Sequence, residues 1–168
     1  NADALLMRLC QQGRVIRAGP MVRWPDGTST NTYEFDHELV RAAVLDAVPI
    51  PRRPALHRRI GGRLEAVCKS TTGDIAAQLA AHFEQSGDYD RALAHHYEAG
   101  VVARRRSAPE VASKHFRRAL TLVRSLPASQ RRDLWEADLL VAVGRELVIS
   151  DGLMSKAAND AYRRAMEL

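Results

Sequence analysis

The segment EVASKHFRRAL (110–120) places Ala112, Phe116 and Ala119 at successive spacings of four and three residues. These spacings return side chains to one face of an α-helix. Alanines on that face let a neighbouring helix approach closely, and the aromatic ring fills the gap to the next helix. The segment therefore predicts one member of a closely packed helical hairpin.

A second segment, AANDAYRRAMEL (157–168), repeats the alanine–aromatic–alanine spacing. A third, GDYDRALAHHYEA (87–99), departs from it, because Tyr97 comes one position late and His96 takes the aromatic position. The alanines of this third segment precede those of the first by 20 residues. The three segments resemble the second helix of tetratricopeptide repeats, which recur about every 34 residues. The residues expected to make the repeat packing are Leu79, Ala80, Phe83, Ala92, Ala99, Ala112, Phe116, Ala119, Ala158, Tyr162 and Ala165.

From residue 37 onward the hydrophobic pattern predicts only helices joined by short turns, with Ser107 as the N-cap of one of them. Helices of hairpin size with short turns favour a stacked array over a four-helix bundle. The expected helices span 37–48, 54–70, 74–85, 89–106, 107–126, 129–150 and 154–168. The further side chains expected on buried faces include Leu39, Val40, Ala43, Val44, Ala47, Leu56, Ile60, Leu64, Leu134, Leu139, Leu140, Val143 and Leu147.

The first 36 residues have a different pattern. A helical segment is followed by three short β-type runs at 15–19, 21–25 and 32–35. Asp26 and Gly27 lie between the last two runs, and Asp-Gly is a strong turn signal. This order of elements is that of the tail of a winged-helix unit, with the hairpin as its wing.

The predicted fold class is therefore mainly α: a partial winged helix with a short β-hairpin wing, followed by a tetratricopeptide-like α-solenoid. The expected domains are the C-terminal part of a winged-helix unit (1–48), a linker helix (49–72) and helical repeats (73–168).

Composition restricts the function only loosely. The 168 residues carry a formal net charge of +5, which permits contact with nucleic acid or an acidic surface without requiring it. Cys10 and Cys68 lie in apolar helical patterns without metal-ligand spacing, so we expect free thiols, no metal and a cytoplasmic location. No apolar run approaches the roughly 18 residues of a membrane span. We also expect the chain to be a piece of a longer protein.

Two long segments carry a resemblance to a known family. Residues 33–66 (YEFDHELVRAAVLDAVPIPRRPALHRRIGGRLEA) and 74–100 (DIAAQLAAHFEQSGDYDRALAHHYEAG) resemble the region after the ATPase domain of bacterial signalling proteins related to the STAND class. Residues 139–168 are similar to a recurrent segment of that family. The resemblance implies a segment that couples an upstream ATP- or ADP-binding module to an effector, such as a LuxR-type DNA-binding domain, a nucleotide cyclase or a kinase.

The resemblance also implies the partners, which are the protein's own ATPase and effector domains. The sequence contains no GxxxxGK[ST] phosphate loop and no serine or cysteine nucleophile motif. We therefore expect no cofactor bound by this chain itself and no catalytic activity. The sequence does not predict the oligomeric state.

His37 is the candidate cofactor-binding residue. It follows a predicted strand and opens a helix, in the position that a Met-His-Asp motif occupies in STAND-type proteins, where the histidine contacts the β-phosphate of ADP. Here the local sequence is Phe35-Asp36-His37, so the match departs in detail. The alternative is that Asp36 caps the helix and His37 merely packs.

The most basic part of the chain lies between residues 104 and 132, where Glu110 is the one acid. Arg104, Arg105, Arg117 and Arg118 form a candidate basic docking surface. The alternative function is a nucleic-acid-binding module made by the wing and the basic helices. His57 and His115 are expected on helix surfaces, because charged and polar side chains of helices are usually solvated.

Overall fold

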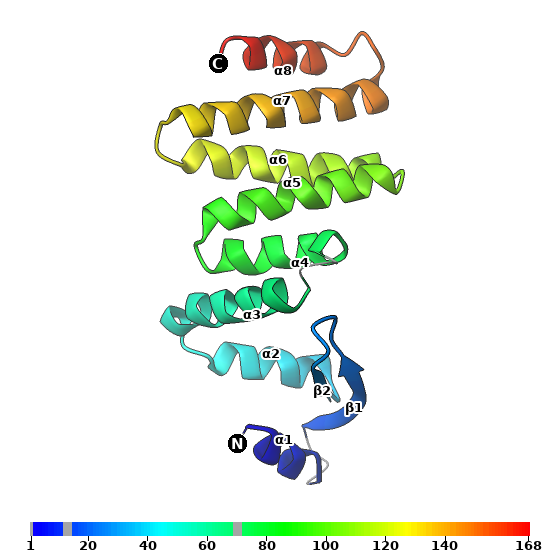
Figure 1. Ribbon diagram of the computed structural model, residues 1–168, viewed down its shortest axis with the longest axis vertical. Coiled ribbons are helices and arrows are strands. Elements are labelled where there is room, and N and C mark those ends of the chain that lie inside the picture. Colours follow the sequence, from blue (N-terminus) through cyan, green and yellow to red (C-terminus); the bar gives the residue numbers. More distant parts are fainter. Residues whose placement is uncertain (1, 12–14, 69–71) are drawn as a thin grey trace.

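The computed structural model describes residues 2–11, 15–68 and 72–168. The chain is mainly helical: within the described residues, a β-hairpin is followed by seven α-helices (Figure 1). The elements are α1 (Ala2–Gln11), β1 (Ile16–Arg23), β2 (Ser29–Phe35), α2 (Glu38–Ala47), a 3₁₀ turn (Ile50–Arg52), α3 (Arg53–Val67), α4 (Thr72–Gln85), α5 (Tyr89–Arg105), α6 (Pro109–Ser125), α7 (Gln130–Asp151) and α8 (Lys156–Met166).

Strands β1 and β2 form an antiparallel hairpin around the predicted Asp26-Gly27 turn. Gly27 has a φ of +84°, and the Thr28 N–H donates to Asp26 Oδ1 at 2.9 Å. The two β-type runs predicted before this turn form one strand, in which the pairing is irregular between Ala18 and Met21. This interval contains a proline, which has no N–H to donate to the ladder.

Helices α3 to α8 are stacked in chain order, and consecutive helices pack against each other (Figure 1). The core lies between them and is centred on fully buried side chains such as Leu79, Phe83, Phe116 and Leu139. Among the residues expected to make the repeat packing, Tyr162 and Ala165 are partly exposed, and the others are buried. Within the described residues, the prediction of helices only after residue 37 is confirmed.

The turns after α4 and α5 share one backbone geometry. Gly87 and Ser107 have positive φ angles of 76° and 56°. The N–H groups of Gly87 and Asp88 donate to carbonyl groups of α4, and those of Ser107 and Ala108 donate to carbonyl groups of α5. This pair of bonds is the Schellman motif, which ends helices. Ser107 therefore ends α5, and its predicted role as an N-cap is wrong, since Ala108 is the N-cap of α6 and Pro109 follows.

Several apolar side chains predicted to be buried are exposed. Helix α2 has no buried residue, and Leu39 is 84% exposed and Val44 44% exposed. Leu56 and Ile60 of α3 and Leu134 of α7 are also exposed. The prediction of burial is wrong at these positions, because helical spacing identifies an apolar face without showing that another element covers it.

Candidate interaction groove

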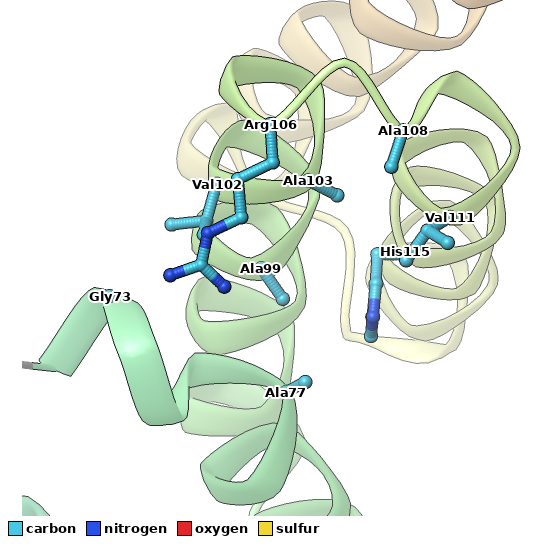
Figure 2. A pocket seen from close by; sticks show the side chains of 9 residues that line it. All are labelled: Gly73, Ala77, Ala99, Val102, Ala103, Arg106, Ala108, Val111 and His115. Carbon is cyan, nitrogen blue, oxygen red and sulfur yellow. The ribbon is translucent and has the colours of Figure 1, made fainter.

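A groove runs along α5 between α4 and α6. Its first part, shown in Figure 2, has a floor of small side chains, among them Ala99 and Ala103 of α5. Ala77 of α4 lies on one side, and Val111 and His115 of α6 lie on the other. The remaining lining residues are Gly73, Val102, Arg106 and Ala108. The groove exists because small residues of α5 do not fill the space between its two neighbours.

Two further hollows continue the groove along α6. His115 borders the first and second hollows, and Arg118 and Thr121 border the second and third. The second hollow is lined by His96, Lys114, His115, Arg117, Arg118 and Thr121. The third is lined by Glu84, Gln85, Tyr89, Arg118, Thr121, Leu122 and Ser125. We call these three hollows together the α4–α6 groove.

A chain of four polar side chains crosses the middle of the groove. Arg118 of α6 donates to the Glu84 carboxylate of α4 through Nε at 3.0 Å and through Nη2. Glu84 Oε2 lies 3.0 Å from His96 Nε2, and His96 Nδ1 lies 3.1 Å from His115 Nδ1. The chain therefore ties α4, α5 and α6 together.

The protonation of this chain follows from burial and hydrogen bonding. Burial lowers the pKa of His96, although the Glu84 carboxylate opposes the shift. Burial, followed by the neighbouring His96, lowers the pKa of His115. The hydrogen bond from Arg118 holds the pKa of Glu84 below its usual value. Both imidazoles are thus neutral at pH 7, with His96 Nε2 donating to Glu84 and His115 Nδ1 donating to His96 Nδ1.

A second pair of imidazoles joins α3 to α4. His57 Nδ1 lies 3.0 Å from His82 Nδ1, and burial lowers the pKa of His82. Nearby, His95 Nε2 of α5 lies 3.0 Å from Glu65 Oε1 of α3. His57 and His115 are both half-buried, and each pairs with a histidine of another helix. His57 therefore bonds across helices and not only within its own helix. The described residues contain no group of three or more side chains arranged to hold a metal ion.

These histidine pairs were not predicted from the sequence. The available signal was His96 itself, which stands in an aromatic position of a repeat and is therefore on a buried face. Its partner His115 lies 19 residues away on another helix, so no local pattern links the two.

The four arginines of the candidate basic surface differ in their partners. Arg118 is bound by the Glu84 carboxylate of α4. Arg104 Nη1 lies 3.9 Å from the buried Glu146 of α7, and the Arg104 guanidinium lies over a phenylalanine ring. Within the described residues, Arg105 and Arg117 have no carboxylate partner. Part of the positive charge counted in the sequence is therefore neutralised by acids from other helices.

His37 lies between β2 and α2, outside the helices that line the groove. It is the N-cap residue of α2, and its side chain makes no capping hydrogen bond. The alternative in which Asp36 caps this helix is therefore wrong. The side chain of His37 is exposed. The phosphate contact that the resemblance implies stays a prediction.

Comparisons with family models, curated proteins and solved structures found no match to this chain. The functional interpretation consequently rests on the residues and on their geometry. In the part of the chain that the structure describes, no helix is both long and apolar enough to cross a membrane.

Proposed function

We propose that this chain is a non-catalytic coupling and protein-interaction segment of a bacterial STAND-type signalling ATPase. In this proposal α1, the hairpin and α2 form the tail of a winged helix, and the later helices form a tetratricopeptide-like solenoid. The segment relays the nucleotide state of an upstream ATPase module to an effector domain in the cytoplasm.

The observation that carries the proposal is the α4–α6 groove on a stack of helices. Extended surfaces of this kind are what stacked helical repeats use to bind other proteins. The polar groups in the middle of the groove are bound to one another by the contacts of Glu84 with Arg118 and with His96. Such groups hold helices together, and this arrangement favours a binding surface over a catalytic centre.

The internal pairing of arginines disfavours the rival function of nucleic-acid binding. Phosphate contacts require cations that are free to release their counterions. Arg104 and Arg118 already face Glu146 and Glu84 within the fold, so fewer cations are free than the sequence suggests.

The test is to titrate this chain, by calorimetry, with the separately purified ATPase and effector modules of the protein that contains it, with ADP and with ATP. We expect this chain to bind at least one module, with an affinity in the presence of ADP that differs from the affinity in the presence of ATP. Titration with duplex DNA at several salt concentrations is the control. Salt-dependent DNA binding without binding to either module would overturn the proposal and favour the nucleic-acid function.

A further inference from the structure

The middle hollow of the α4–α6 groove is bordered by three cations, two of which have no carboxylate partner within the described residues. Lys114 has no carboxylate partner within the described residues, and Arg117 Nε donates only to the Ser113 hydroxyl, at 3.2 Å. Arg118 borders the same hollow, but Glu84 already binds it. Two positive charges of α6 therefore face this part of the groove without an internal counter-charge.

The first hollow, which adjoins this cationic part, is mainly apolar. Ala77, Val102 and Val111 contribute to its walls (Figure 2). His115 borders both hollows and marks the point where the apolar part of the groove meets the cationic part. An occupant that lies along the groove therefore meets small apolar side chains first and cations next.

We propose that the α4–α6 groove binds an extended segment of a partner protein that carries apolar residues beside carboxylates. The apolar residues lie over Ala77, Val102 and Val111, and the carboxylates lie over Lys114 and Arg117. This inference rests on the proposed function and adds to it the chemistry of the partner.

Charge and shape together favour this occupant. Opposite charge across an interface fixes the register and excludes the wrong partners, while exposed ion pairs are individually weak because water screens them. Burial of apolar side chains on the alanine and valine surface must therefore supply part of the affinity. A nucleic acid matches only the cationic half, because a sugar-phosphate backbone gains nothing from the apolar half.

The experiment measures the fluorescence anisotropy of a labelled peptide that has alternating leucine and alanine residues followed by glutamates. A peptide with the reverse order of the two blocks covers the other direction of binding. One control peptide has glutamine in place of glutamate, and another has glutamate throughout. We expect the peptides with both blocks to bind most tightly, the glutamine peptide to bind about tenfold more weakly, and the all-glutamate peptide not to bind detectably.

Variants of the chain locate the binding surface. The double variant Lys114→Glu/Arg117→Glu should weaken binding by about tenfold or more, and Ala77→Gln, which fills the apolar part, should weaken it as well. The matched control is Arg131→Glu/Arg145→Glu on α7, which makes the same change in net charge at exposed positions outside the groove. This control should bind within about twofold of the wild type, because distant sites act independently. Circular dichroism verifies that each variant is folded.

Three results would overturn the inference: no binding of either mixed peptide below millimolar concentration, equal binding of the all-glutamate peptide, or equal loss in the α7 control. Tighter binding of a single-stranded oligonucleotide that the Lys114→Glu/Arg117→Glu variant loses would also overturn it, in favour of nucleic acid. If the groove variants bind the ATPase or effector module as the wild type does, this inference fails while the proposed function stands. If no module binds the wild type, the proposed function itself fails.

Discussion

At the scale of single residues, the close approach of α5 and α6 depends on the absence of one side chain. Gly100 of α5 is buried, and a Cβ at this position would lie 2.5 Å from Phe116 Cε1. Phe116 was predicted from the sequence as a packing residue, but its glycine partner was not. A glycine in a helix has no periodic signature of its own, and only the helix crossing shows that it is required.

We expect Gly100→Ala to destabilise the fold by about 1–3 kcal/mol through overpacking against Phe116. The control is Gly62→Ala in α3, where an added Cβ meets nothing within 4 Å. This variant should stabilise the fold by about 0.5–1 kcal/mol, because alanine favours a helix more than glycine does. Urea unfolding of both variants measures the two free energies. Equal stability of Gly100→Ala and the wild type would mean that α5 and α6 cross less closely.

At the scale of helices, neighbouring elements are joined by imidazoles as well as by apolar contacts. His96 of α5 pairs with His115 of α6, and His57 of α3 pairs with His82 of α4. Each contact requires at least one neutral ring, since two imidazolium ions 3 Å apart repel each other. The stability of the stack should therefore depend on pH.

The folded state lowers the pKa values of His82, His96 and His115 below 6.5 through burial. As pH falls below 6.5, the unfolded chain binds protons that the folded chain does not, so the free energy of unfolding decreases. Above pH 7 these residues should have no effect on the pH dependence. Glu84, whose pKa is also lowered, loses its contribution only at more acidic pH, below the range of the imidazoles.

The measurement is the urea midpoint at several pH values between 5.5 and 7.5. We expect His115→Gln to reduce the loss of stability on acidification, because the amide can still donate to His96 and does not titrate. His37→Gln serves as the control, since this side chain is exposed and lies outside the stack. An unchanged pH dependence in His115→Gln would show that the imidazole pair does not contribute.

At the scale of the whole molecule, the two ends of the helical stack differ in character. The exposed side chains of α8 are mainly polar, among them Asp160 and Arg163, which are paired at 3.5 Å, while Met166 is 82% exposed. At the other end, α2 exposes Leu39 and Val44. The buried apolar cluster lies in α4 to α8, and α2 has no buried residue.

We expect Leu39→Glu to change the free energy of unfolding by less than about 0.5 kcal/mol, because the side chain is exposed. Leu79→Ala, in the fully buried core of α4, should cost about 2–5 kcal/mol. Thermal or urea unfolding of the two variants gives the comparison. A large loss in Leu39→Glu would indicate that α2 is covered in solution.

The remaining prediction concerns the longer protein of the proposed function. His37 opens α2 beside the first N–H groups of that helix, a favourable place for a phosphate. If the upstream module presents ADP there, His37→Ala should weaken ADP retention by roughly ten- to a hundredfold, the effect of losing one hydrogen bond to a charged group. The activity of the effector domain without a signal should rise. Asp46→Ala near the other end of α2 is the control, and unchanged ADP affinity in His37→Ala would remove the phosphate contact.

The sequence by itself determined the kinds of elements and most of their limits. The spacing of Ala112, Phe116 and Ala119 and the Asp26-Gly27 turn depend on residues a few positions apart, and backbone geometry makes such patterns readable locally. The tertiary structure decided which faces are covered and which charges are neutralised. Glu84 meets Arg118 across 34 residues of sequence, because the packing of α4, α5 and α6 brings the two side chains to one groove, and no local pattern encodes that contact.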